Sequence, residues 1–159
     1  MKIDENIISH RIYGGFLGRV IGSTIGSVVE GRKYEDIKAM HGTIDHYVGF
    51  KPDDRGFIIG IPNDDEMFEI VLLMTLEERG NELTTKDIAR KWLDLIPPNF
   101  TFTAERVAID RFKQGIFLFG EDLVEGNPYH DFIGAQMRAE MPGWMHPAEL
   151  DAAITLARI

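Results

Sequence analysis

The sequence predicts an all-α protein. Several segments repeat apolar residues at helical spacing between helix-start and helix-stop residues, most clearly at 64–79, from 84 or 85 to 96, and from about 103 onward. One short apolar run, Phe57-Ile58-Ile59, is compatible with a strand. A chain of 159 residues is long enough to bury a core. We therefore expect a single helical domain over residues 1–159.

Composition and charge argue against several classes of function. The chain is 44% hydrophobic and 27% charged, with a formal net charge of −9, which argues against a broad nucleic-acid or anionic-membrane surface. The absence of cysteine excludes disulfides, thiolate nucleophiles and cysteine-based zinc sites, and it fits a reducing compartment. No signal peptide and no run of about 18 apolar residues is evident. We expect a cytoplasmic protein that binds neither nucleic acid nor membranes.

The first predicted helix covers residues 8–29 and carries a glycine repeat. Each glycine costs about 1 kcal/mol relative to alanine in a helix interior, so the repeat favours close packing by another helix. Glu30 closes this helix, at the end where the helix dipole disfavours negative charge. A glutamate there is usually solvated, but the misfit marks Glu30 as a candidate functional residue. The repeating glycines share one helix face: Gly14, Gly18, Gly22 and Gly26.

Residues 41–62 are rich in glycine and proline and predict an irregular connection, within which Asp53-Asp54 reads as a turn. The helix predicted over 64–79 follows. Eight of the ten residues from Met67 to Leu76 are apolar, which is typical of a buried helix.

The start of this helix, Asn63-Asp64-Asp65-Glu66, has two interpretations. Asparagine is a good N-cap, acidic residues in a first turn complement the dipole, and Asn63 with Glu66 is close to a capping box. Alternatively, Asp64 and Asp65 are oxygen ligands for a divalent cation such as Mg²⁺ or Mn²⁺. This stretch alone favours capping, and both interpretations can hold together.

Later segments complete the helical pattern. Pro97-Pro98 ends the helix that begins at Thr84 or Thr85, and the helix from about Thr103 carries an apolar stripe that extends to Ile116 and Phe119. Residues 120–147 return to glycine and proline. A last helix, 148–159, is still apolar where the sequence ends, so we expect missing helices or a partner chain to cover it.

Other catalytic classes find less support. His130-Asp131 is compatible with a metal phosphohydrolase of the His-Asp type, but His10, His41, His46 and His146 show no matching spacing. No serine lies in a nucleophile elbow, and no pair of histidines is spaced four residues apart to begin a zinc site.

Residues 18–30, 62–66 and 127–138, taken together and in register, resemble three stretches of the ADP-ribosylglycohydrolase family, relatives of dinitrogenase reductase-activating glycohydrolase. Residues 18–30 resemble the glycine-rich first helix of the family, which ends in a functional glutamate. Residues 62–66, Pro-Asn-Asp-Asp-Glu, resemble its Thr-Asp-Asp metal motif. Residues 127–138 resemble the segment that shapes the ADP-ribose pocket in one bacterial branch. The resemblance spans nearly the whole chain and favours metal ligation at Asp64 and Asp65.

The resemblance implies an orthogonal multi-helix bundle that binds two Mg²⁺ or Mn²⁺ ions and cleaves the glycosidic bond between ADP-ribose and its acceptor. It implies metal ligation by Asn63, Asp64 and Asp65 and catalysis by Glu30 and Asp65. The implied ligands are ADP-ribose or an ADP-ribosylated substrate. The implied substrate-binding residues are Gly134, Ala135, Gln136 and Arg138.

The chain also departs from the family pattern. Ser23 replaces a common aspartate, Asn63 replaces a threonine, and Glu66 replaces a second threonine. The later Asp-x-Asp motif that closes the metal site has no counterpart in these 159 residues. We therefore expect a fold that is incomplete at its C-terminus, with weak or absent hydrolysis by this chain alone. A non-catalytic ADP-ribose-binding or assembly module, completed by a missing half or by homo-oligomerisation, is the alternative.

Overall fold

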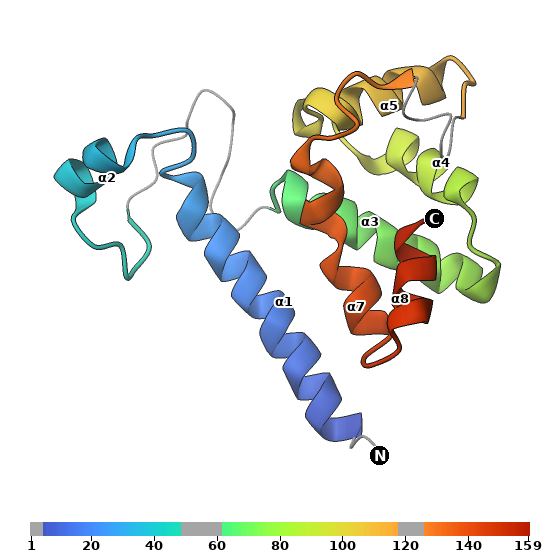
Figure 1. Cartoon of the computed structure of the whole chain (residues 1–159), viewed down its shortest axis with the longest axis horizontal. Coiled ribbons are helices and arrows are strands. Elements are labelled where there is room, and N and C mark those ends of the chain that lie inside the picture. The colour runs from blue at the N-terminus through green and yellow to red at the C-terminus, as the bar shows by residue number, and fades with distance from the viewer. Residues whose placement is uncertain (1–4, 49–61, 118–125) are drawn as a thin grey trace. The chain divides into compact units, whose positions relative to one another are not determined.

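The computed structural model describes residues 5–48, 62–117 and 126–159, and every regular element in these ranges is helical, as predicted (Figure 1). The possible strand at 57–59 lies outside the described residues, as do Asp53-Asp54 and Phe119. The contacts divide the chain into two compact units, Met1–Asn63 and Asp64–Ile159. Among the described helices, none is long and apolar enough for a membrane span. The single-domain organisation stays a prediction.

The first unit contains α1 (Glu5–Ser27) and α2 (Tyr34–His41). The predicted first helix was wrong at both ends by a few residues. It begins at Glu5 and ends at Ser27, so Glu30 lies in the following turn instead of closing the helix. Helix α2 is an element that the sequence analysis missed. Its C-terminus is capped by Gly42, whose φ of 66° suits glycine and whose N–H donates to the Lys38 carbonyl.

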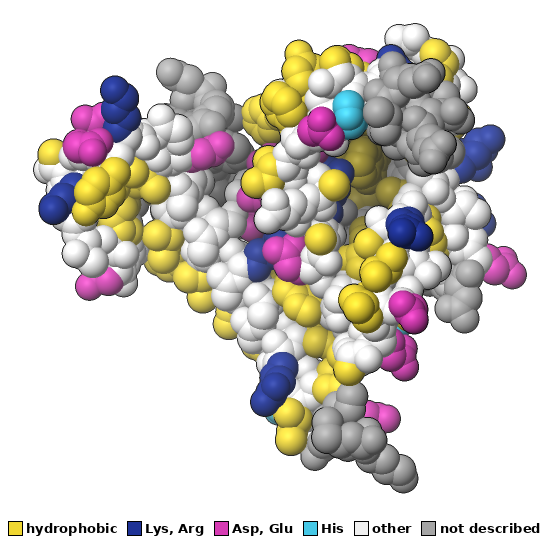
Figure 2. Space-filling view, in the orientation of Figure 1, with side chains coloured by type: hydrophobic (Ala, Val, Ile, Leu, Met, Phe, Trp, Pro, Cys, Tyr) yellow, Lys and Arg dark blue, Asp and Glu magenta, His cyan; other side chains and the backbone are white. Residues whose placement is uncertain are grey.

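Helix α1 buries none of its own residues, and its apolar side chains are visible along its length in Figure 2. At each glycine of the repeat, no described atom lies within 4 Å of the position that an added Cβ would take. The close helix packing predicted for this face is therefore not found within the described residues of the first unit. The large hydrophobic residues exposed on α1 are Ile7, Tyr13, Leu17 and Ile21.

The second unit is built on α3 (Asp64–Arg79), whose predicted bounds are confirmed. Helix α3 packs against α4 (Thr85–Leu95), and α4 packs against α5 (Thr103–Lys113). Single 3-10 turns, η1 (Gly80–Glu82) and η2 (Pro98–Phe100), join these helices. Ile116, predicted to extend the apolar stripe of the α5 helix, lies beyond its end.

The remaining elements were only partly predicted. The 3-10 helix η3 (Ile133–Arg138) and α7 (Glu140–Met145) lie in the stretch expected to be irregular. Helix α8 (Leu150–Ala157) corresponds to the last predicted helix and packs against α7, while η3 packs against α3.

The core of the second unit forms where α3, α4 and α5 meet. Phe68 and Val71 are each 1% exposed, and the ring of Trp92 meets that of Phe68 edge-on with centroids 4.7 Å apart. Edge-to-face aromatic pairs of this kind stabilise a core by about 1 kcal/mol beyond their area. Ile96 and Ile109 complete the buried cluster.

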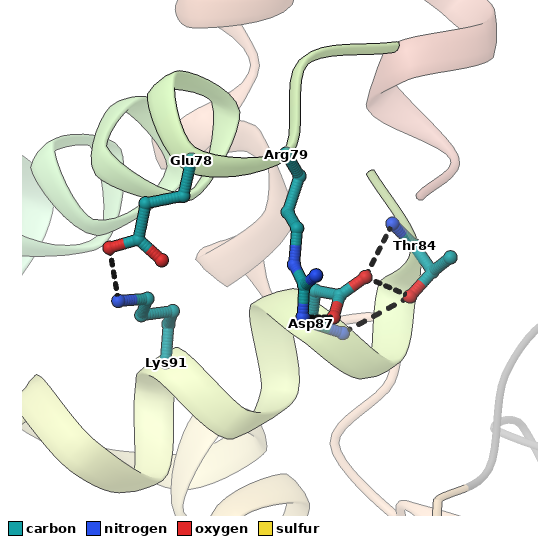
Figure 3. Close-up of polar contacts among 5 residues, drawn as sticks. All are labelled: Glu78, Arg79, Thr84, Asp87 and Lys91. Carbon is teal, nitrogen blue, oxygen red and sulfur yellow. Dashed lines mark hydrogen bonds and ion pairs between the residues drawn. The ribbon is translucent and has the colours of Figure 1, made fainter. Parts of the chain in front are cut away.

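Polar contacts set the connection between α3 and α4 (Figure 3). Thr84 and Asp87 form a capping box at the start of α4. Of the two starts that the sequence left open, Thr84 is the cap and Thr85 the first helical residue. Asp87 also lies 2.9 Å from Arg79 at the end of α3, and Lys91 lies 2.5 Å from Glu78. These contacts fix the direction in which α4 returns along α3.

Candidate functional site

The predicted metal ligands lie where the two units join in sequence. Asp64 and Asp65 occupy the first turn of α3 and are half-buried. Behind them, Glu66 is 3% exposed and Glu69 is fully buried, so carboxylates continue along α3 into the interior. A first turn of this composition concentrates negative charge at the positive end of the helix dipole.

Asn63 contacts a residue that the sequence analysis noted only as a departure from the family. Its side-chain amide donates a hydrogen bond to the hydroxyl of Ser23, which lies forty residues earlier in α1. This contact directs the nitrogen of Asn63 toward α1, so the amide oxygen is the atom suited to ligate a cation. The sequence analysis noted Ser23 and Asn63 as separate departures and did not predict that they would meet.

The donor set suits a hard cation in kind but is short in number. Carboxylate and amide oxygens are the ligands that Mg²⁺ and Mn²⁺ prefer. Within the described ranges, no three histidine, aspartate or glutamate side chains lie close enough to hold a metal ion. Glu30 lies in the turn after α1, in the first unit. Its role beside Asp64 and Asp65 stays a prediction.

The predicted substrate segment forms η3, which packs against α3 in the second unit. Ala135 and Gln136 are exposed, whereas Gly134 is buried. Arg138 turns inward, and its Nη1 donates to Oε1 of Glu105 at 3.0 Å. The structure therefore places the predicted substrate residues on one short element, with an anchor that the sequence analysis did not identify.

Arg138 is held by both charge and aromatic contacts. Its guanidinium lies 5.0 Å from the ring centre of Phe68 and 4.9 Å from that of Trp92. Burial lowers the pKa of Arg138, and the adjacent charge and hydrogen bond of Glu105 oppose that shift. The positive charge of Arg138 is therefore balanced by Glu105 where the side chain meets the core aromatic rings.

A cavity of about 340 Å³ opens beside η3 in the second unit. Aromatic and aliphatic side chains form most of its wall, and a few polar groups converge on it, as is usual for small-molecule sites. Of the predicted substrate residues, Ala135 and Arg138 line it. The aromatic and polar lining residues include Phe68, Trp92, Phe112, Phe132, Glu105, Asn127 and His130.

Comparison with protein families decides the identity of the fold. A family model described as ADP-ribosylglycohydrolase matches residues 4–159. The chain belongs to the ADP-ribosylglycohydrolase family. Searches of curated proteins and of solved structures gave no significant match. The resemblance drawn from the three motifs is confirmed, and the family assignment supports hydrolysis of ADP-ribosyl linkages as the activity of the group.

Within an ADP-ribosylglycohydrolase-type chain, His130-Asp131 has a local structural explanation. Nδ1 of His130 lies 3.0 Å from the carbonyl oxygen of Asn127, and Nε2 lies 3.2 Å from Asp131. Asn127 in turn donates to the carbonyl of Ala104 and accepts from the N–H of Tyr129, which fixes the turn before η3. The phosphohydrolase alternative gains no support, because the described residues supply no further ligand beside this pair.

Proposed function

We propose that the chain acts in metal-dependent hydrolysis of ADP-ribosyl glycosidic bonds. The observation that carries the proposal is the start of α3. Two adjacent, half-buried carboxylates, Asp64 and Asp65, open the helix against which the η3 segment packs. A family that processes ADP-ribosyl linkages needs oxygen donors for a cation and a pocket for the nucleotide, and α3 connects the two.

In this proposal, Asn63, Asp64 and Asp65 hold Mg²⁺ or Mn²⁺ through oxygen atoms. Bound divalent ions supply Lewis acidity and lower the pKa of water. Glu30 and Asp65 are the proposed catalytic carboxylates, since a carboxylate within hydrogen-bond reach of a water can accept its proton. Nearby carboxylates also stabilise the oxocarbenium-like transition state of glycosidic cleavage.

The substrate side of the proposal rests on η3 and the cavity. Ala135 and Gln136, which are exposed, present a small and a polar side chain to ADP-ribose, with the buried Gly134 beneath them, and Ala135 and Arg138 line the cavity. Since Glu105 already compensates the charge of Arg138, we assign Arg138 to holding the segment and shaping the wall. A pyrophosphate would meet little uncompensated positive charge from this side chain.

Two carboxylates and an amide are few ligands for two ions. We therefore expect weak metal binding and slow release of ADP-ribose by the chain of 159 residues. The direct test incubates it with an ADP-ribosylated protein, with and without Mg²⁺, and measures free ADP-ribose. Metal-dependent release that is lost in Asp64→Ala supports the proposal. Release that persists without metal contradicts it.

The alternative is a non-catalytic module that binds ADP-ribose or assembles with a partner. The exposed apolar residues of α1 favour this alternative, since such side chains are typical of protein contact surfaces. Titration calorimetry with ADP-ribose separates the two functions. Binding that needs Mg²⁺ supports the hydrolase lineage, whereas an absence of binding together with oligomers in light scattering supports the assembly module.

A further inference from the structure

Glu105 is a buried carboxylate that the proposed reaction does not use directly. It lies near the start of α5 and is 5% exposed. Its carboxylate contacts two positions of η3, the residue Gly134 and the side chain of Arg138. Both contacts join parts of the chain that are about thirty residues apart, so they are tertiary contacts of η3.

The contact with Gly134 leaves no room for a side chain. A Cβ added at Gly134 would lie 1.7 Å from Oε1 of Glu105, far closer than any van der Waals contact allows. Glycine at this position therefore permits the carboxylate to reach the backbone of η3. The same oxygen accepts the hydrogen bond from Arg138 at 3.0 Å.

The pair at Glu105 and Arg138 is better suited to fixing geometry than to adding stability. A buried ion pair recovers little net free energy, because removing two charges from water offsets their attraction. Directional contacts nevertheless fix the residues that make them. Phe68 and Trp92 also contact the Arg138 guanidinium, so the Arg138 end of the segment 134–138 is held by three side chains, and the Glu105 carboxylate fills the space beside Gly134 at the other end.

We propose that Glu105 is a positioning residue that sets the backbone of η3 by holding Gly134 and Arg138. Ala135 and Gln136 lie between these two anchored positions, and they are the residues that the proposed function assigns to ADP-ribose. The inference rests on that proposed function for its biological meaning. Glu105 acts through η3 and does not itself contact the ligand.

Hydrogen exchange of the whole chain tests the anchor without any ligand. In Glu105→Ala, exchange of the amides of 133–138 should rise about tenfold, while exchange of the α4 amides should not change, because only local opening becomes easier. Glu105→Gln retains an acceptor oxygen of the same shape and should show a smaller rise. The control is Asp110→Asn, on the same helix but exposed and paired with Lys113 at 3.6 Å. Unchanged exchange at 133–138, or an equal rise throughout the unit, would overturn the inference.

A double substitution gives a readout that a purely structural role would not move. Gly134→Ala should weaken ADP-ribose binding by about tenfold in the wild-type background, because the added methyl displaces η3 from Glu105. In the Glu105→Ala background the obstructing carboxylate is gone, so the same substitution should change affinity by less than about threefold. Additive effects would refute a direct contact.

The proposed function and the positioning role of Glu105 can be refuted independently of each other. If the wild-type chain does not bind ADP-ribose with Mg²⁺, the proposed function is wrong for this chain. Hydrogen exchange in the same single and double variants still decides whether Glu105 positions η3. Gly134→Ala should raise the exchange of the 133–138 amides in the wild-type background. A smaller rise in the Glu105→Ala background supports the anchor, and an equal rise in both backgrounds refutes it.

Discussion

Helices α3 and α4 each follow a residue type favoured as an N-cap and carry an acid three positions after it, but the two acids lie in different surroundings. At the start of α4, Asp87 accepts a hydrogen bond from the N–H of Thr84, and Thr84 accepts one from the N–H of Asp87, each at 3.2 Å (Figure 3). At the start of α3, the corresponding acid is Glu66, which is buried. The capping box at α4 fully accounts for its acid, whereas the carboxylates of α3 continue into the interior.

A cap residue followed by an acid three positions later marks where a helix starts, but it does not show whether the acid is buried or exposed. The spacing of a cap residue and an acid three positions later predicts a helix start, and both starts are confirmed. It does not predict which way the first turn faces. That direction depends on the packing beneath the turn, and the first turn of α3 lies directly before the buried Phe68. The carboxylates that continue from Asp64 and Asp65 to the buried Glu66 and Glu69 make the α3 start a candidate site. The completed capping box, in which Asp87 is already used, makes the α4 start a structural feature.

Phe68→Ala should have the largest effect, because it removes the packing that distinguishes the α3 start. Truncating a fully buried phenylalanine costs about 3–5 kcal/mol in the free energy of unfolding, which urea denaturation measures directly. Ile88→Ala, near the start of α4 and only half-buried, should cost less. Equal losses at both positions would show that the two helix starts do not differ in their underlying packing.

Asp65→Asn should weaken the binding of a divalent cation, whereas the same change at the start of α4 should not. The substitution keeps the size of the side chain but removes its charge, so the apparent affinity for Mn²⁺ should fall by at least about tenfold. Calorimetric titration of Mn²⁺ measures the change. The matched control is Asp87→Asn, the same chemical change at the start of α4, which should leave Mn²⁺ binding unaltered. If both variants bind Mn²⁺ like the wild type, the acids of α3 serve only to cap and complement the helix.

The helical pattern of the second unit was largely predictable from sequence. Helix α3 is apolar nearly all round, and α4 has both a threonine cap and a proline stop, so local signals define their bounds. The short elements η3 and α7 were missed, because each spans six residues and is stabilised by tertiary contacts instead of its own periodicity. Helix α2 was missed for a similar reason, since it has only eight residues.

The candidate site was predictable only where its residues are neighbours in sequence. Asp64 and Asp65 form a motif that can be read directly. Glu105 could not be found in this way, because a glutamate in the first turn of a helix normally complements the dipole at the surface. The signal that identifies it is spatial. It consists of a glycine with no room for a side chain and an arginine that turns inward, both more than twenty-five residues away.

Thr84→Ala removes the cap of α4 and should lower the free energy of unfolding by less than Phe68→Ala does. Removal of an N-cap hydroxyl costs about 1 kcal/mol in the free energy of unfolding, because the N–H of Asp87 loses its side-chain acceptor and keeps only the Thr84 carbonyl. Urea denaturation measures this loss, and ADP-ribose and Mn²⁺ binding should not change. Thr84→Ser retains the hydroxyl and should restore most of the stability. A loss of metal affinity in Thr84→Ala would mean that the α4 start also contributes to the site.

The smallest expected effect is the pH dependence of the α4 capping box. The hydrogen bond from Thr84 holds the pKa of Asp87 below its usual value of 3.8, with Arg79 adding to this shift. A carboxyl whose pKa is lowered on folding contributes stability above its unfolded pKa and loses that contribution as the pH falls through its folded pKa. The wild type should therefore be more stable than Asp87→Asn at pH 7, and the difference should shrink below about pH 4. Urea denaturation of both proteins between pH 7 and pH 3 measures it. A difference that stays constant across this range would show that Asp87 stabilises α4 through its shape and not through its charge.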